Sequence, residues 1–254
     1  MTEIRTIRQD ECEEYLSVLC ESFALDLGRA RTAFFGEPYF SLDRKWCSIK
    51  DRRIISILTV VPIEFGDGKG IGIAGVATRE EDRGSGHASE LLNFVCDYYA
   101  ANDAPKALLF AKEQSLYEGV GFKLADCVYV QPLAAGRAAH PQPIEKDKVK
   151  AIYDDWATRD PRRLRRDDAR WTYWSWTLRT PVALDGGYFC YENARLRELL
   201  PSYSRLPISE PIDFYGTAAI AEAIGVTLDN PMVDLYLMAK GFNYVPQMFM
   251  TDQF

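Results

Sequence analysis

The chain has 254 residues, of which 47% are hydrophobic and 26% charged, a composition typical of a globular protein that argues against disorder. Its net charge of −7 disfavours nonspecific binding to nucleic acids and favours cationic partners. The chain has only two histidines, and its six cysteines form no CxxC pair, which argues against a zinc site or a Ser–His triad. No apolar run reaches the roughly 20 residues of a membrane span.

The first half of the chain alternates strands with helices. The predicted elements are, in chain order, a strand (3–8), a helix (10–23), two strands of a hairpin (52–65 and 71–78) around a Gly-rich turn, a helix (87–103), a strand (106–111), a short helix (115–122) and a strand (123–130). The segment 24–46 is predicted to be helical in part and otherwise fits no single element. This order predicts an α/β domain with a mixed sheet over residues 1–133.

The second half changes character after a segment rich in Ala, Gly and Pro, residues 134–145, which is typical of a linker. Residues 146–254 predict a smaller α+β domain. The basic run "RRLRR" at 162–166 is followed by two aspartates, which favours a solvated helix start with local ion pairs over a contact with RNA or phosphate. Trp171 and Trp174 share one helical face, which favours core packing between the halves over a ligand wall.

The turn "DRGSG" places two glycines, which have no side chains, just before the helix 87–103 begins. Gly84 and Gly86 follow Arg83, and the strand 71–78 precedes them. Main-chain N–H groups at a helix start have no partner in the helix, and the helix dipole adds partial positive charge there. A strand, a glycine turn and a helix therefore suit an anion, although the glycines alone are equally compatible with a plain structural turn.

The wider segment resembles motif A of the GNAT superfamily of N-acetyltransferases, whose core is Arg/Gln-x-x-Gly-x-Gly/Ala. That core stands here as Arg83, Gly86 and Ala88. Residues 108–122 are similar to motif B of the same family, a strand and a short helix with Tyr-x-x-x-Gly-Phe. The resemblance covers roughly residues 1–133. It implies the GNAT fold, a mixed and mostly antiparallel sheet flanked by helices, and the use of acetyl-CoA.

The resemblance also implies which residues hold acetyl-CoA. The end of one strand would pair with the pantetheine arm as if the arm were another strand, and the glycine turn would hold the pyrophosphate. The residues implied are Val76, Ala77 and Thr78 for the arm, and Arg83, Gly84, Ser85, Gly86, His87, Ala88 and Ser89 for the pyrophosphate. No metal is expected.

Acetyl transfer to an amine needs a base and a proton donor. An alkyl ammonium has a pKa near 10.4, so a base must deprotonate it, and the departing thiolate benefits from a donor. The resemblance gives the donor role to Tyr117, whose alternative role is packing under the sheet. Glu113 is a candidate base. Glu21, Asp26 and Glu37 are further candidates that fit solvated surface charges better.

The second half resembles the middle portion of the enhanced-intracellular-survival type of acetyltransferase, from "RRLRR" to "GGYFCYENARLRELL". In that type a chain-terminal carboxylate, often on a phenylalanine, reaches the active site as base. Phe254 is therefore a third candidate for a catalytic role. Those relatives are much longer and carry a third, lipid-carrier-like domain.

The leading hypothesis is an N-acetyltransferase that acetylates a primary amine of a small, cationic acceptor. The alternatives are a noncatalytic acyl-CoA sensor or scaffold, and an acetyltransferase that acts on a protein or tRNA. The N-terminal segment lacks the apolar stretch of a signal peptide, so we expect a cytoplasmic protein with reduced thiols and without a membrane partner. The sequence leaves the oligomeric state open, a homo-oligomer included.

Overall fold

The computed structural model describes residues 2–134, 142–177, 180–203, 206–208 and 210–254. Within them one mixed sheet has the strand order β1-β2-β3-β4-β5-β11-β6-β10-β9-β8-β7. The strands are β1 (Glu3–Thr6), β2 (Lys45–Lys50), β3 (Arg53–Phe65), β4 (Gly68–Thr78), β5 (Lys106–Ala111), β6 (Lys123–Pro132), β7 (Val182–Leu184), β8 (Gly187–Glu192), β9 (Arg195–Leu200), β10 (Asp213–Thr217) and β11 (Met232–Lys240). Only β4–β5 and β10–β9 pair in parallel, so the predicted mixed, mostly antiparallel sheet is confirmed.

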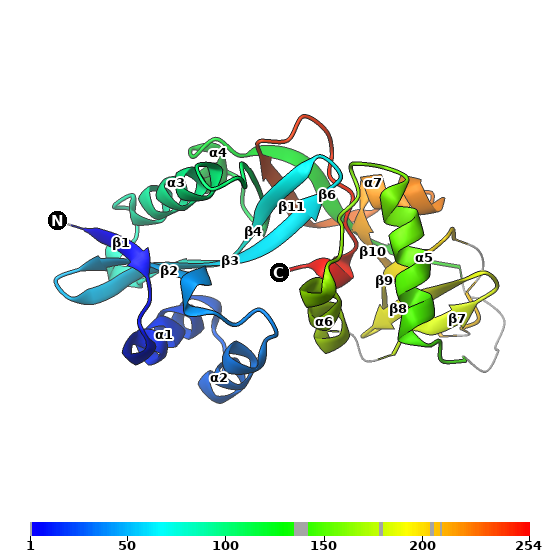
Figure 1. Cartoon of the computed structure of the whole chain (residues 1–254), viewed down its shortest axis with the longest axis horizontal. Helices are drawn as coiled ribbons and strands as arrows, with labels where there is room; N and C mark the ends of the chain where they lie inside the picture. Colours follow the sequence, from blue (N-terminus) through cyan, green and yellow to red (C-terminus); the bar gives the residue numbers. More distant parts are fainter. Residues whose placement is uncertain (1, 135–141, 178–179, 204–205, 209) are drawn as a thin grey trace.

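Helices cover both faces of the sheet (Figure 1). They are α1 (Cys12–Phe23), α2 (Leu27–Gly36), α3 (His87–Ala100), α4 (Ser115–Glu118), α5 (Lys146–Thr158), α6 (Asp168–Thr177) and α7 (Ala218–Ile224), with 3-10 turns at Gln9–Glu11, Leu42–Arg44, Glu80–Asp82 and Met250–Asp252. In the first half α3 packs on one face and α1 on the other. The segment 24–46, which was predicted to be helical in part, contains α2 and the start of β2.

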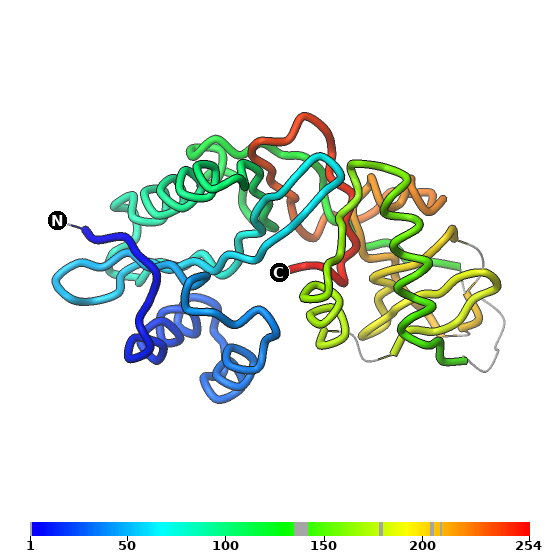
Figure 2. The backbone as a smooth tube through the Cα atoms, viewed as in Figure 1, coloured from blue at the N-terminus to red at the C-terminus, as the bar shows by residue number. Residues whose placement is uncertain are grey.

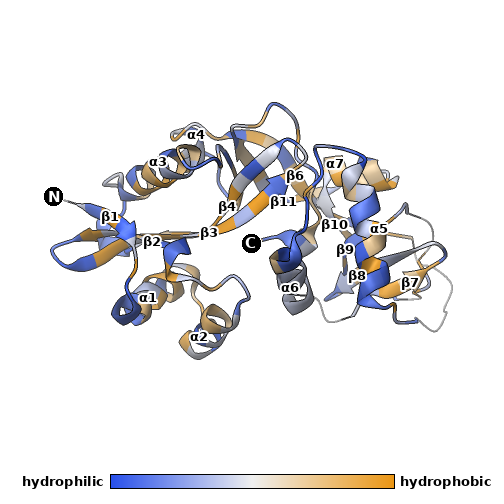
Figure 3. Cartoon of the chain, viewed as in Figure 1, coloured by the Kyte–Doolittle hydropathy of each residue, from blue (hydrophilic) through white to orange (hydrophobic). Residues whose placement is uncertain are grey.

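Hydrophobic patterning explains how the layers form. Leu91, Leu92 and Val95 of α3 lie at helical spacing and are fully buried against β3 and β4. Tyr15 and Leu16 of α1 are buried on the opposite face. In Figure 3 apolar colours mark much of β3 and β4, whereas α5 turns a mostly hydrophilic side to the viewer. None of the described helices is both long and apolar enough to cross a membrane.

The last strand joins the two halves of the chain. β11 comes from the C-terminal segment, yet it lies between β5 and β6 and is antiparallel to both. The sheet therefore runs without a break through residues that the sequence assigned to two domains. The division at 134–145 stays a prediction, and residues 135–141 of that linker lie outside the described part of the chain.

After β11 the chain turns back toward the middle of the molecule. Figure 2 shows this final segment, in red, ending beside α6 and close to β3. The C-terminal residue thus lies at the centre of the structure instead of on its rim (Figure 1). This placement brings the end of the chain to the point where the middle strands separate.

Candidate active site

Strands β4 and β5 run side by side for only part of their length. Their pairing ends at Ile73 opposite Leu109. Just beyond this point β4 carries a bulge, because Gly75 and Val76 together stand opposite one residue of β3. Gly75 has a φ of +59°, a left-handed conformation that glycine adopts readily. The β5-side edge of β4 has no strand partner beyond Ile73 in the described residues, so its backbone groups are available to an extended ligand.

The turn between β4 and α3 leaves a row of main-chain N–H groups free. Gly84 and Gly86 have φ values of +78° and +82°. Gly86 is the N-cap residue of α3, and no side chain caps the helix. Within the described part of the chain, none of the N–H groups from 84 to 89 donates to a protein acceptor. A free helix N-terminus of this kind attracts an anion.

These N–H groups border a cavity of about 450 Å³, the coenzyme cavity. Its lining is Val76, Ala77, Thr78, Asp82, Arg83, Gly84, Gly86, His87, Ala88, Ser89 and Leu116. Nine of these eleven residues are in the set implied by the family resemblance. Asp82 and Leu116 were not in that set, and Ser85, which was, does not line the cavity.

Several polar atoms at the edge of the coenzyme cavity have no hydrogen-bond partner among the described residues. Arg83 is exposed and donates only its Nε to the carbonyl of Thr78, at 3.1 Å, which leaves the rest of its guanidinium free. His87 Nδ1 and Asp82 Oδ2 are buried without a hydrogen-bond partner among the described residues. A ligand with hydroxyl, amide and phosphate groups fits this mixture of free donors and acceptors.

Tyr117 lies in α4, one residue after Leu116 of the cavity wall. Its ring packs edge-on against Phe122, with centroids 6.3 Å apart, and is half-buried. In the described part of the chain its hydroxyl has no hydrogen-bond partner. Burial raises the pKa of Tyr117, which keeps the hydroxyl protonated at neutral pH.

A second cavity of about 250 Å³, the acceptor cavity, lies on the α1–α2 face of the sheet. Its lining is Leu19, Leu25, Ala30, Ala33, Phe34, Glu37, Lys45, Thr59, Val61, Ala74, Gly75, Tyr173, Trp176 and Phe254. The two cavities share no lining residue, but they border neighbouring residues of the β4 bulge, Gly75 for this cavity and Val76 for the coenzyme cavity. A group transferred from one cavity to the other would pass the bulge.

Phe254 packs against the sheet at this point. Its ring covers Gly72 of β4 so closely that a Cβ on Gly72 would come within 2.5 Å of it. Phe110 of β5 also lies against the ring, with centroids 5.7 Å apart. The Tyr173 hydroxyl donates to the carbonyl of Gln253 at 2.9 Å and holds the preceding residue. The third predicted catalytic residue therefore lies in the wall of the acceptor cavity.

The predicted acids are distributed unevenly. Glu37 faces the acceptor cavity in an ion pair with Lys45 at 2.6 Å; burial lowers the pKa of Lys45, although Glu37 opposes this effect. Glu113 is exposed and has no hydrogen bond or ion pair with the described residues. Asp26 caps α2, and Glu21 lies 3.4 Å from an arginine on the surface. Lys45 had no sequence signal, because nothing in "RKWCSIK" marks it as a cavity residue.

A buried ionic cluster in the second half holds the C-terminal segment in place. The guanidinium of Arg166 binds Glu198 of β9 at 2.7 Å and Asp252 at 2.6 Å, and all three side chains are fully buried. Thr251 donates its hydroxyl to Glu198, and Trp174 donates its indole N–H to the same carboxylate at 2.9 Å. These bonds join β9, α6 with the segment that leads into it, and the turn that precedes Phe254.

This cluster corrects the expectation for the basic run at 162–166. Arg162 does pair locally with Asp160, but Arg166 is buried, and the run ends before α6 begins at Asp168. The reason is that two distant carboxylates supply its counter-charges, which local spacing does not reveal. The expected core packing of Trp171 and Trp174 is confirmed, since both are buried in the core of the second half. Among the described residues no group of His, Cys, Asp and Glu is placed to hold a metal ion.

Comparison with known proteins identifies the first half. A family model described as an acetyltransferase (GNAT) domain matches residues 3–125, just under half of the chain. A GCN5-related N-acetyltransferase from Kribbella flavida has a similar structure, with 14% sequence identity and a TM-score of 0.72 over 94% of this chain and 70% of that one. A GCN5-related N-acetyltransferase from Anabaena variabilis shows 16% identity and a TM-score of 0.69 over 94% and 72%.

Eis1 from Mycobacterium abscessus is also similar, with 13% identity and a TM-score of 0.61 over 93% of this chain and 73% of that chain. No match was found among curated proteins. At these identities the likeness concerns the fold. It extends over both halves of the chain, so the fold that the sequence predicted for the first half belongs to a larger shared architecture that includes the second half.

Proposed function

Because residues 3–125 form a GNAT acetyltransferase domain and the chain is thus an acyltransferase, we propose that it moves the acetyl group of acetyl-CoA to a primary amine of a small acceptor. One observation supports this proposal: two cavities border neighbouring residues of the β4 bulge, Val76 for one and Gly75 for the other. One is rich in free main-chain donors, and the other is a mainly apolar pocket. Such a pair suits a phosphate-bearing donor and an organic acceptor.

The coenzyme cavity offers the groups that acetyl-CoA needs. When bound, acetyl-CoA supplies the thioester whose acetyl group is transferred. The free N–H groups of residues 84–89 and the guanidinium of Arg83 would hold its pyrophosphate. The unpaired edge of β4 at Val76 and Ala77 would bind the pantetheine arm through main-chain hydrogen bonds.

Tyr117 is proposed as the general acid. Attack of the amine nitrogen on the thioester carbon forms a C–N bond and breaks the C–S bond, and the departing sulfur takes a proton. Tyr117 follows Leu116 of the coenzyme cavity wall, its hydroxyl has no hydrogen-bond partner among the described residues, and its raised pKa keeps the proton available.

The base is proposed to act from the acceptor cavity. Residue 254 lines that cavity, and a chain that ends there would present its α-carboxylate as the base. Glu113 is the alternative; it lies after β5 but is exposed and has no partner that would orient it. A carboxylate at the cavity wall would meet the first requirement of a base, which is access to the proton it removes.

The acceptor cavity favours an amine on an apolar body. Among the described residues its charged side chains are Glu37 and Lys45, which neutralise one another and leave only the proposed α-carboxylate to attract the ammonium of an acceptor. Rings and aliphatic groups form most of the remaining wall, with Trp176 and Leu25 at its exposed edge. We therefore propose a monoamine with an aromatic or aliphatic body as acceptor, ahead of a polyamine with several charges.

The test is turnover of acetyl-CoA with a panel of amines. The panel contains phenethylamine, tryptamine, spermidine and an aminoglycoside, and acetylated product is detected by mass, because six native thiols would react with a thiol dye. We expect the aromatic monoamines to be the best acceptors. Tyr117→Phe should lower kcat about 100-fold and leave acetyl-CoA binding unchanged. Tyr98→Phe, an exposed tyrosine of α3, is the matched control.

Two alternatives have distinct outcomes in this assay. Binding of acetyl-CoA without turnover of any amine would favour the noncatalytic sensor. Turnover only with protein or tRNA would favour the macromolecular acceptor. That second alternative has lost its main support, because Arg166 of the basic run is buried and is not part of a docking surface.

A further inference from the structure

The proposed reaction uses two cavities, and a third, larger cavity takes no part in it. It measures about 470 Å³ and lies between the outer part of the β3–β4 hairpin, the end of α3 and the segment that leads into α6. Its lining is Tyr39, Arg44, Val60, Pro62, Ile63, Glu64, Lys69, Gly70, Ile71, Tyr99, Asn102, Ala104, Arg165, Asp167 and Arg170. We call it the hairpin cavity. Of its residues, none lines the coenzyme cavity or the acceptor cavity.

Four basic residues line the hairpin cavity, and none of them has an ion-pair partner among the described residues. They are Arg44, Lys69, Arg165 and Arg170. The protein has 37 acidic residues against 30 lysines and arginines, so unpaired cations in one cavity run against the overall balance of charge. Only two acids, Glu64 and Asp167, line the same space, and both are exposed to solvent.

Arg170 is the most unusual of these residues. Its side chain is only 2% exposed, yet its guanidinium has no carboxylate partner in the described part of the chain. It donates to the carbonyl of Pro62 at 2.6 Å and, more weakly, to that of Asp252 at 3.5 Å. Carbonyl dipoles solvate a buried cation only in part, and an anion nearby would lower its free energy.

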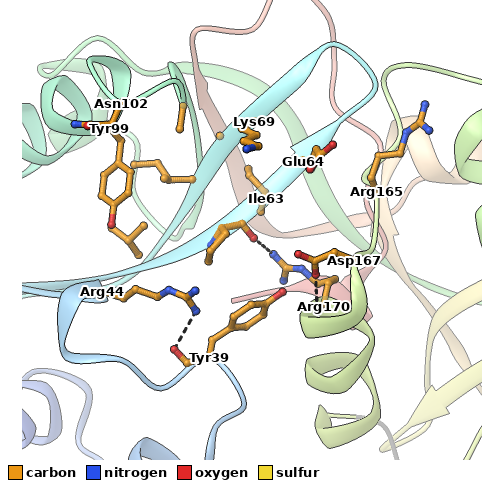
Figure 4. A pocket seen from close by; sticks show the side chains of 15 residues that line it. Tyr39, Arg44, Ile63, Glu64, Lys69, Tyr99, Asn102, Arg165, Asp167 and Arg170 are labelled. Carbon is orange, nitrogen blue, oxygen red and sulfur yellow. Dashed lines mark hydrogen bonds between the residues drawn. The ribbon is translucent and has the colours of Figure 1, made fainter.

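Arg44 completes the arrangement from the other side. The guanidinium carbons of Arg44 and Arg170 lie 5.0 Å and 5.2 Å from the centre of the same ring, that of Tyr39. Figure 4 shows the two side chains reaching toward this ring from different segments, with Lys69 above them. Arg44 donates one N–H to the carbonyl of Tyr39 at 3.1 Å. The Tyr39 hydroxyl has no hydrogen-bond partner among the described residues.

We propose that the hairpin cavity is a binding site for a small multivalent anion, held by Arg44, Arg170 and Lys69. Guanidinium groups bind carboxylates and phosphates in two-pronged geometry, and Lys69 adds a mobile third charge. The two guanidiniums lie against the same ring and repel each other, and an anion that contacts both would reduce that repulsion. The Tyr39 hydroxyl is a further donor, since burial raises its pKa to about 12 and keeps it protonated.

Calorimetric titration at constant low ionic strength tests the proposal. Citrate and inorganic pyrophosphate are the two probes, and the tighter one tells whether the site prefers carboxylates or phosphates. Lys69 is exposed and unpaired, so Lys69→Gln leaves the fold intact; it should raise the Kd up to about fivefold. Arg44→Gln should raise the Kd about tenfold or more. Lys50→Gln, an exposed lysine outside the cavity, should leave it unchanged.

Arg83→Gln separates this site from the coenzyme cavity. If the probe binds in the hairpin cavity, Arg83→Gln keeps the wild-type Kd for citrate, while Lys69→Gln and Arg44→Gln weaken binding. The proposal is overturned if neither probe gives saturable heat with the wild type. It is also overturned if Lys69→Gln and Arg44→Gln bind like the wild type, or if only Arg83→Gln weakens binding.

Discussion

The coenzyme cavity and the acceptor cavity border the same bulge of β4 but are built in different ways. Almost every group in the first comes from residues 76–89, and its donors are main-chain N–H groups exposed by two glycines with positive φ. The second is assembled from side chains of α1, α2, β2, β3, β4, α6 and residue 254. A site made of backbone depends on local conformation, whereas a site made of distant side chains depends on the packing of the whole molecule.

Removal of Arg166 should show this dependence most strongly. Arg166→Met leaves the carboxylates of Glu198 and Asp252 buried without their cation, which should cost about 3–5 kcal/mol in the free energy of unfolding. The turn before Phe254 loses its anchor, so acceptor turnover should fall while acetyl-CoA binding persists in the folded fraction. Urea unfolding and calorimetry with acetyl-CoA measure the two effects. Arg162→Met, at an exposed local pair, is the control.

The same cluster predicts how stability depends on pH. Desolvation would raise the pKa of Glu198, but Arg166 and the hydrogen bonds outweigh it and leave the pKa below its ordinary 4.5. A carboxyl with a lowered pKa in the folded state stabilises the fold above pH 4.5, and this contribution is lost as the pH falls. Unfolding midpoints between about pH 3 and pH 7 should show this loss in the wild type. An equal loss in Arg166→Met would contradict it.

The same contrast explains which features of the fold and site could be predicted from the sequence. The glycine turn and most strands and helices of the first half follow from local periodicity and short motifs, and the structure has the fold they predict, although α2 was predicted only in part and β2 was not predicted. The resemblance to motif B singled out Tyr117. The insertion of β11 between β5 and β6 was not predicted, because strand pairing across more than a hundred residues leaves no local pattern. Lys45 of the acceptor cavity and the partners of Arg166 were missed for the same reason: each depends on contacts between distant segments.

Variants at residue 254 test whether the acceptor cavity also supplies the base. Deletion of Phe254 moves the α-carboxylate to Gln253 and should lower kcat about 100-fold. Phe254→Ala keeps the carboxylate and loses only the ring over Gly72, so its kcat should fall less. Glu113→Gln should change kcat less than about threefold, because Glu113 is exposed and unoriented. Initial rates with the best amine give these values; a large loss in Glu113→Gln alone would transfer the role of base to Glu113.

Gly86→Ala tests the cavity that is built from backbone. Gly86 has a φ of +82°, and a Cβ at this position would meet no atom within 4 Å, so alanine costs backbone strain of about 1 kcal/mol without a clash. In the coenzyme cavity that strain shifts the free N–H groups, and the Kd for acetyl-CoA should rise about tenfold. Gly225→Ala is the matched control, because Gly225 has a φ of +78° in equally open space at the end of α7. Equal acetyl-CoA affinity in both variants would mean that the glycine turn serves the fold alone.

Substitution of Trp176 should give the smallest effect, and it tests the preference for the acceptor most directly. The tryptophan is 46% exposed at the edge of the acceptor cavity, and its ring packs on that of Tyr173, with centroids 5.9 Å apart. Trp176→Ala should raise the KM for an aromatic monoamine about three- to tenfold, because the variant loses a ring contact, and should leave the KM for acetyl-CoA unchanged. With spermidine, which buries no ring, the same variant should act like the wild type. A uniform rise in KM for both amines would mean that Trp176 shapes the cavity without contacting the acceptor, and the preference for an apolar body would then have to come from Phe34 and Val61, which are buried in the same wall.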